Sequence, residues 1–392
     1  KLKNLSFTYL IKKNFGELNN LRGSMEGFQV NAGDISFKKG DNLEIRGNLK
    51  SDFKLNKTIF DDFIDEVYLK QLTNIEASGN LTKKFVIIFD DTLKVSNYDF
   101  KATGNVKKSK INFDNFQKYT FVNNEIQSVY LEKVDFKIDL NNLNKKKFDI
   151  SGIYKINKKA FNKFNFSNII NNDQQNIDFA ADYDNGLNFP LLNYSSGNRT
   201  VNLETKLQVT EKTLNLNLLS LKEGNTKILV NDLFLKDKKL RNFNEISVKT
   251  FNKNLKNNDF NINYKKKIEI KGLKYDASNL IKIISEENNS NFLKNISKEI
   301  FVNFDEVKTT DSDTLLDFSL VGYIDKGKFN KIVSKGEFQD NKYLEISLIK
   351  DKSSKNKILE IYSDMPKTLL SSYSFFKGLS GGQLLLNSTY DQ

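Results

Sequence analysis

The sequence contains no cysteine and no histidine. Without them the chain has no thiol nucleophile, no disulfide, no histidine general base and no zinc site made of histidine and cysteine ligands. Only 2 of the 392 residues are proline. With 38% hydrophobic and 28% charged residues, the composition argues against a disordered chain and against a membrane-embedded one. No apolar run approaches the roughly 20 residues that a membrane-spanning helix needs.

The chain also lacks a run of proline, glycine or serine that would mark a linker between domains. One elongated architecture is therefore the simplest prediction for a chain long enough to form two or three ordinary domains. The sequence starts at Lys1 with no apolar stretch of the signal-peptide kind, and it stops just after a predicted strand. We therefore expect it to be a piece of a longer protein.

Positive charge is abundant, and nearly all of it is lysine. The 61 Lys and Arg residues against 49 Asp and Glu give a net charge of +12, yet only four are arginine: Arg22, Arg46, Arg199 and Arg241. Proteins that read nucleic acid combine arginine with aromatic residues, a pattern that is missing here. The lysine runs at 145–147 and 265–267 lie between predicted strands, as solvated loops and charged sheet edges do. We predict no nucleic-acid partner.

Residues 1–272 alternate repeatedly between apolar and polar side chains. Val134, Phe136 and Ile138 alternate with Asp135 and Lys137, and the same period recurs at residues 148–156 and 214–218. A period of two predicts β-strands with one apolar and one polar face. An antiparallel sheet of such strands either packs its apolar face against a second layer or closes on itself, or it curls into a trough whose lining serves something other than its own core.

A loose refrain containing glycine runs through the same region. It reads IRGNLK from Ile45, ASGNLTK from Ala77, ATGNVKK from Ala102 and ISGIYK from Ile150. Its irregular spacing does not fit a strict solenoid repeat and indicates one hairpin after another. Glycine inside a strand indicates a bulge or sharp coiling of the sheet.

Three stretches interrupt the predicted strands. Residues 162–173, which contain many Asn and Phe, are predicted as a short helix or a loop, and the polar residues 252–261 as a loop. Phe189-Pro190 predicts an edge strand or a strand break.

The C-terminal part predicts helices as well as strands. In residues 276–300, apolar side chains follow helical spacing after a capping Asp276 or Ser278, which indicates one or two amphipathic helices. Ser363-Asp364 can cap a second, short helix at 365–377, where proline is tolerated because it falls in the first turn. Gly381-Gly382 then turns the chain into a last strand.

At these residues the chain resembles AsmA-like envelope proteins, in the YhdP-type branch. The resemblance is carried by an S-D dipeptide after an apolar strand, a short helix and a G-G-x-L-x-L turn and strand, and upstream by IEIKGLKYDASNLIKII from Ile268 to Ile284. It covers about the last third of the chain, and Met365-Pro366-Lys367 departs from the Asp-Ala-Gly that the family tends to have. We accordingly divide the chain into a repetitive β-groove segment, 1–272, and an AsmA-like C-terminal module, 273–392.

The resemblance implies a mainly β fold, a long, strongly twisted antiparallel sheet curled into an open groove, with a few short helices near the C-terminal end. It also implies a function without enzymatic activity or cofactor. Such proteins carry phospholipid between the inner and the outer membrane, so this chain is expected in the periplasm, anchored to the inner membrane by a segment outside it. Both membranes would be reached through such outside segments, and other envelope proteins are further candidate partners.

The groove would be lined by the apolar members of the alternating strands. The candidate lipid-lining residues are Val134, Phe136, Ile138, Leu214, Leu216, Leu218, Phe318, Leu320, Leu344, Ile346, Leu384 and Leu386. The same residues would form the core of an ordinary β-sandwich if a second layer covered them.

Two other classes of function compete with lipid transfer. A β-rich carbohydrate-active enzyme would use paired carboxylates, and Asp61-Asp62, Asp90-Asp91 and Asp311 with Asp313 are such pairs. Acidic pairs in an Asn- and Lys-rich chain are typical of turns, and none of these lies in a recognisable catalytic motif. The stronger alternative is a structural or adhesive β-rich envelope protein without lipid cargo.

Overall fold

The protein is known from a computed structural model, which describes residues 3–61, 72–117, 121–142, 145–280, 296–309, 313–351, 356–370 and 381–390. Strands make up 77% of the structure and helices 4%, so the predicted mainly β class is confirmed. The chain divides into two compact units. Unit 1 comprises residues 1–186 and 206–211, and unit 2 comprises 187–205 and 212–392.

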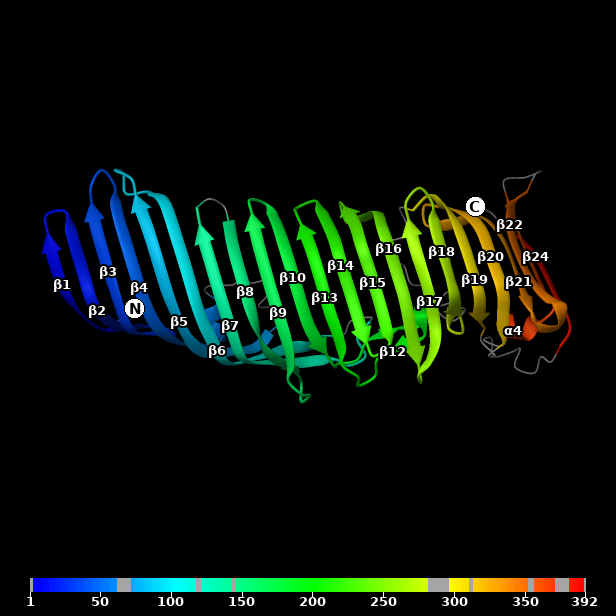
Figure 1. Ribbon diagram of the computed structural model, residues 1–392, viewed down its shortest axis with the longest axis horizontal. Coiled ribbons are helices and arrows are strands. Elements are labelled where there is room, and N and C mark those ends of the chain that lie inside the picture. The colour runs from blue at the N-terminus through cyan, green and yellow to red at the C-terminus, as the bar shows by residue number, and fades with distance from the viewer. Residues whose placement is uncertain are drawn as a thin grey trace. The chain divides into compact units, whose positions relative to one another are not determined.

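Unit 1 is a succession of antiparallel hairpins (Figure 1). Each strand from β1 to β9 pairs antiparallel with the next one in sequence. This confirms the prediction of one hairpin after another. The helix α1, Lys57–Asp61, follows β4. The strands are β1 Lys3–Lys12, β2 Phe15–Met25, β3 Phe28–Lys39, β4 Leu43–Leu55, β5 Leu72–Phe89, β6 Val95–Gln117, β7 Ile126–Asn141, β8 Lys145–Ile156, β9 Asn162–Asn171 and β10 Gln174–Tyr183.

Unit 2 begins with a small hairpin of β11, Asn188–Phe189, and β12, Tyr194–Ser195, joined by the 3-10 turn η1, Pro190–Leu192. The strand break predicted at Phe189-Pro190 is confirmed. A further strand, β13, Val201–Val209, has residues in both units. The main strands are β14 Thr213–Glu223, β15 Thr226–Lys236, β16 Lys239–Asn252, β17 Leu255–Tyr264, β18 Ile268–Asp276, β19 Lys298–Lys308, β20 Thr314–Asp325, β21 Lys328–Phe338, β22 Lys342–Lys350, β23 Lys357–Ser363 and β24 Leu384–Tyr390.

The ladder of unit 2 contains one parallel pair. Successive strands from β14 to β18 and from β19 to β24 pair antiparallel, but β18 and β19 are parallel. A parallel pair needs a crossover of a dozen or more residues, and residues 277–297 separate these two strands. The prediction of a purely antiparallel sheet is therefore wrong at this point.

The helix predictions have mixed outcomes. Helix α4, Pro366–Leu370, begins where the 365–377 helix was predicted, and residues 371–380 lie outside the described part. For the predicted helical segment 276–300, Asp276 instead ends β18 and residues 298–300 begin β19. Residues 281–295 lie outside the described residues. The 3-10 turn η2, Gln339–Asn341, connects β21 to β22.

Two stretches predicted to leave the sheet are strands. Residues 162–171 form β9, whose Phe164 and Phe166 alternate with Asn and Ser in the ladder. Residues 255–264 form β17, with a turn only at Lys253-Asn254, where both backbones are left-handed. The Asn-rich composition favoured a loop or a helix in these segments. They form strands because neighbouring strands pair with them. The predicted domain boundary at 272/273 lies within β18, and the 1–272 and 273–392 division stays a prediction.

Candidate functional site

Unit 1 has a face of apolar side chains that follows directly from strand register. Neighbours directly across a ladder point to the same side of the sheet, so cross-strand partners can be followed from strand to strand. One such chain of partners, the unit 1 row, consists of Ser51, Leu81, Gly104, Phe136, Ile150, Phe166 and Phe179. The predicted lining residues Val134 and Ile138 lie beside Phe136 on the same face, opposite Val106 and Ala102.

The opposite face of the same strands is polar. Asp135, Lys137 and Asp139 pair with Asn105, Thr103 and Lys101. The Nδ2 of Asn105 donates to Oδ1 of Asp135 at 2.9 Å. The two-sided strands predicted from alternation are therefore present in unit 1.

Glycines of the refrain let the rings of this face lie close to the backbone. A Cβ on Gly104 would meet the Phe136 ring at 2.5 Å, and one on Gly47 would meet the Phe85 ring at 2.2 Å. The predicted bulges occur as well. The β5–β6 register shifts between Ser78 and Gly79, and the β7–β8 register shifts beside Gly152.

The apolar face of unit 1 is only partly shielded from solvent. Val134 is 3% exposed, whereas Phe136, Ile138 and Ile150 are half-buried. A second layer packed against a sheet would bury such side chains completely. Among the described residues, the rings and aliphatic groups of this face thus keep accessible surface.

Unit 2 has a longer row of aliphatic partners. The aliphatic row, followed from β14 to β24, consists of Leu219, Val230, Ile246, Ile262, Ile270, Val302, Leu320, Ser334, Ile346, Ile361 and Leu386. All are aliphatic except Ser334. Val302 and Ser334 are buried, Leu386 is 37% exposed and the others are half-buried. The row is a stripe of hydrocarbon with accessible surface along it.

The remaining predicted lining residues of unit 2 fall on or near this row. Phe318 lies opposite Phe304, and Leu344 and Leu384 both lie opposite Ser363. Leu344 is buried at 5% exposure, while Phe318 and Leu384 are half-buried.

The three leucines of β14 that were predicted to line the groove, Leu214, Leu216 and Leu218, do not share one row. Leu214 and Leu216 pair with Leu235 and Leu233, but Leu218 pairs with Asn231. Between these partners Asp232 has a left-handed backbone, with φ 52°. It interrupts the alternation, and Leu219 rather than Leu218 continues the aliphatic row.

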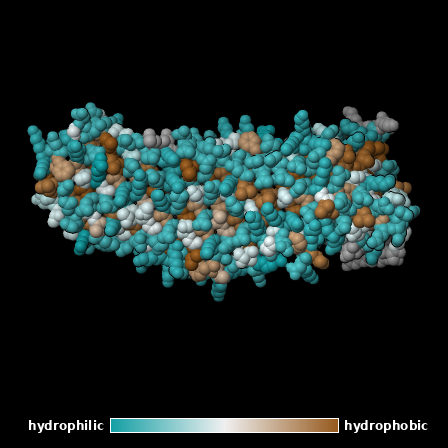
Figure 2. Space-filling model, viewed as in Figure 1, coloured by the Kyte–Doolittle hydropathy of each residue, from teal (hydrophilic) through white to brown (hydrophobic). Residues whose placement is uncertain are grey.

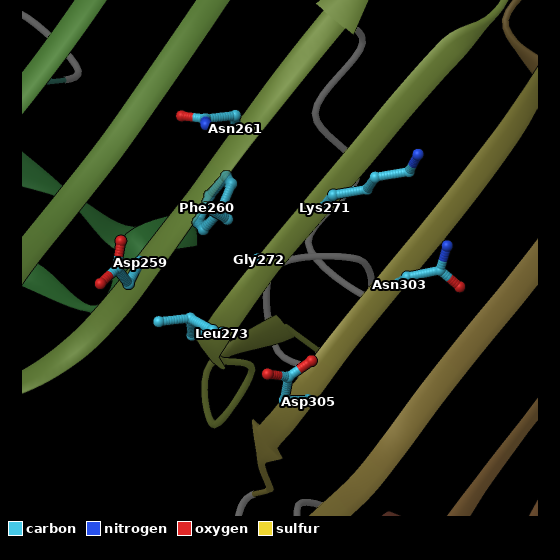
Figure 3. A pocket seen from close by; sticks show the side chains of 8 residues that line it. All are labelled: Asp259, Phe260, Asn261, Lys271, Gly272, Leu273, Asn303 and Asp305. Carbon is cyan, nitrogen blue, oxygen red and sulfur yellow. The ribbon is translucent and has the colours of Figure 1, made fainter.

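On strands β16 to β22 of unit 2, a residue adjacent to each member of the aliphatic row points to the opposite face of the sheet. These residues form a polar row. It consists of Ser247, Asn261, Lys271, Asn303, Ser319, Lys335 and Glu345. Figure 3 shows three of them, Asn261, Lys271 and Asn303, on adjacent strands. Figure 2 shows a molecular surface on which hydrophilic residues predominate and hydrophobic ones are scattered.

The depression in Figure 3 belongs to this polar side. It measures about 420 Å³, and Gly272, which has no side chain, is among the residues that line it. Its carboxylates are Asp259 and Asp305, and Asp259 is paired with Lys256 at 2.6 Å. In the described part of the chain, no three potential ligands gather into a metal site.

A buried polar network closes one end of the unit 2 strands. We call it the clasp; it consists of Leu192, Asn193, Thr250, Asn257, Asn258 and Asp276. Asn258 is fully buried, and its Nδ2 donates to the Leu192 carbonyl at 2.6 Å and to Thr250 Oγ1 at 2.7 Å. Its Oδ1 accepts from the backbone N–H of Asp276 at 2.9 Å. The clasp therefore ties η1 to β16, β17 and β18.

Asp276 is the charged member of the clasp. It is 3% exposed, and its carboxylate accepts from Asn193 Nδ2 at 2.9 Å and lies 3.9 Å from Lys308 Nζ. Because these partners satisfy a buried charge, the clasp is a structural element. Sequence reasoning missed it: the only signal was the Asn-Asn pair at 257–258, in a stretch predicted to be a loop.

The opposite end of the same strands carries a basic depression of about 610 Å³. We call it the basic pocket; it is lined by Asp232, Arg241, Asn242, Phe243, Asn244, Tyr264, Lys265, Lys266 and Lys298. Burial raises the pKa of the Tyr264 phenol, and the nearby Arg241 opposes that rise. The sequence signal was the 265–267 lysine run, which was interpreted as a solvated loop.

Comparisons with protein-family models, curated proteins and solved structures find no match to this chain. Within the described ranges, no helix has the length and hydrophobicity needed to cross a membrane.

Proposed function

We propose that the chain is a non-enzymatic lipid-transfer protein that carries phospholipid acyl chains along the apolar face of its sheet. The observation that carries the proposal is the aliphatic row of unit 2, in which partners on successive strands are hydrocarbon and most remain half-buried. The unit 1 row offers the same kind of surface. An open groove formed by the sheet is part of this proposal, as is a place in the periplasm between the inner and outer membranes, which the AsmA-like resemblance supports.

The energetics explain why such a surface is useful. A phospholipid in water exposes about 30 methylene groups at about 0.8 kcal/mol each, a cost on the order of 20 kcal/mol. Unaided transfer between membranes is therefore negligible. A stripe of half-buried aliphatic side chains removes much of that exposed hydrocarbon from water while the headgroup stays hydrated.

The test compares two neighbouring residues of β20 that lie on opposite faces. Leu320 belongs to the aliphatic row, and Val321 points to the other side with 47% exposure. We expect phospholipid to co-purify with the protein, to be lost from Leu320→Asp because a carboxylate in the row repels acyl chains, and to be retained by Val321→Asp. Organic extraction followed by mass spectrometry measures the lipid, and circular dichroism with thermal melting checks that both variants fold.

Lipid-free wild-type protein, or equal lipid in the two folded variants, would contradict lipid transfer. In that case the structural or adhesive envelope role is the remaining proposal.

A further inference from the structure

The basic pocket gathers more positive than negative charge at one end of the unit 2 strands. Arg241, Lys265, Lys266 and Lys298 line it together with one acid, Asp232. In the described part of the chain, Arg241, Lys265 and Lys266 form no salt bridge. Clustered cations without counter-charges attract anions, most of all where low-dielectric walls surround them.

The wall of the pocket is aromatic. Phe243 and Tyr264 stack with ring centroids 5.3 Å apart, and they are 8% and 4% exposed. The Nζ of Lys298 lies 4.7 Å from the centroid of the Tyr264 ring, and it donates to the Lys265 carbonyl. The cationic head of Lys298 is thus fixed against the stacked rings.

The stacked rings continue the apolar face that holds the aliphatic row. Tyr264 lies two residues beyond Ile262 on β17, about 7 Å along the strand and on the same side. Its partner Ile268 pairs in turn with Ile300. An amphiphile whose hydrocarbon lies on the row therefore has cations within reach of its polar end.

At the clasp end, two of the cations are paired with acids. There Lys308 lies 3.9 Å from Asp276, and Arg199 lies 3.3 Å from Glu223, so these cations already face carboxylates. Exposed lysines such as Lys227 and Lys249 also lie toward the clasp end, but the basic pocket places its cations around a depression with a buried aromatic wall.

We propose that the basic pocket binds the phosphate group of an anionic lipid whose acyl chains lie on the aliphatic row. This inference rests on the proposed function and adds to it the orientation of the lipid and a preference for phosphate-bearing headgroups. Arginine and lysine bind phosphate oxygens through charge-assisted hydrogen bonds, and the tyrosine and phenylalanine rings bridge the charged pocket and the hydrocarbon row.

The test uses two lipids with the same acyl chains, dioleoylphosphatidylglycerol and dioleoylglycerol, which lacks phosphate. We expect the wild-type chain to retain the phosphatidylglycerol in preference after gel filtration. In the double variant Arg241→Gln with Lys266→Gln, both exposed positions, the affinity for phosphatidylglycerol should fall about tenfold, while dioleoylglycerol binding should not change. Lys227→Gln with Lys249→Gln, exposed partners across β15 and β16, removes the same charge elsewhere and should have no effect.

Equal binding of the two lipids by the wild-type chain would refute phosphate binding by the basic pocket. It would leave the lipid-transfer proposal unaffected. A third arm titrates inorganic phosphate, so that a free anion is distinguished from a headgroup. Phosphate binding that the pocket variant abolishes, without any lipid binding, would support a phosphate site and refute the lipid function. Binding of neither lipid nor phosphate would overturn both.

Discussion

At the scale of single residues, Lys83 places a cation within the apolar face of unit 1. It pairs with Leu49 and Ala102 across the neighbouring strands, and its Nζ lies 4.8 Å from the centroid of the Phe28 ring. Burial lowers the pKa of the Lys83 ammonium below its ordinary value of 10.5 because the charged form loses water. The folded state therefore disfavours the charge that Lys83 carries at neutral pH.

Replacing Lys83 by Met should increase the free energy of unfolding at pH 7. The side chain is about half buried, so solvent screening keeps the gain below about 1 kcal/mol. Because the folded-state pKa is lowered, the destabilisation is complete below that pKa and disappears as the pH rises toward the unfolded value of 10.5. Urea unfolding should show the variant's advantage shrinking over that range; an advantage that does not depend on pH would assign the effect to packing instead.

Gly104 is a residue at which a single methyl group is costly. A Cβ there would lie 2.2 Å from the Asn80 carbonyl oxygen and 2.5 Å from the Phe136 ring. We expect Gly104→Ala to lower the free energy of unfolding by about 1–3 kcal/mol through overpacking. Gly40→Ala is the matched control, because no atom lies within 4 Å of a Cβ at that position. Equal denaturation midpoints for the two variants would show that the Phe136 ring does not pack closely against Gly104.

At the scale of elements, the clasp holds η1 against β16, β17 and β18 through the side chain of Asn258. Truncation in Asn258→Ala leaves the Asp276 N–H, the Leu192 carbonyl and the Thr250 hydroxyl without this partner. We expect a loss of about 2–3 kcal/mol in unfolding free energy, since unsatisfied buried polar groups are expensive. Asn261→Ala, on the exposed polar row of the same strand, should change stability little. Similar thermal midpoints for the two variants would contradict a stabilising clasp.

The elements were predictable where alternation was clear and local. Residues 134–138 and 148–156 form the strands that their period indicates, and Pro366 begins a helix as its position predicts. Residues 255–264 were not predictable from composition, because Asn257 and Asn258 are satisfied by Leu192 and Asp276, which are distant in sequence. The parallel pairing of β18 with β19 was not predictable either, since alternation fixes the faces of a strand and not its direction.

At the scale of the whole molecule, the candidate site consists of the unit 1 row and the aliphatic row of unit 2. Some residues of each row were among the lining residues predicted from the sequence. Phe136, Leu320 and Ile346, three of the predicted lining residues, lie on these rows. Leu218 does not continue its row, because the left-handed backbone at Asp232 interrupts the alternation. Such an irregularity is invisible to a count of apolar positions. The basic pocket was missed for a related reason: Arg241, Lys266 and Lys298 come together only through strand pairing.

The succession of hairpins in unit 1 has a consequence for how such a protein changes in evolution. From β1 to β10 the strands pair in sequence order, so backbone pairing is limited to nearest neighbours, as in repeat proteins. Insertion or deletion of two consecutive strands preserves the direction and facing of all the others. A gene encoding such a ladder can therefore lengthen or shorten its product in steps of one hairpin, and the distance that the hydrocarbon stripe spans is adjustable without redesign of the rest.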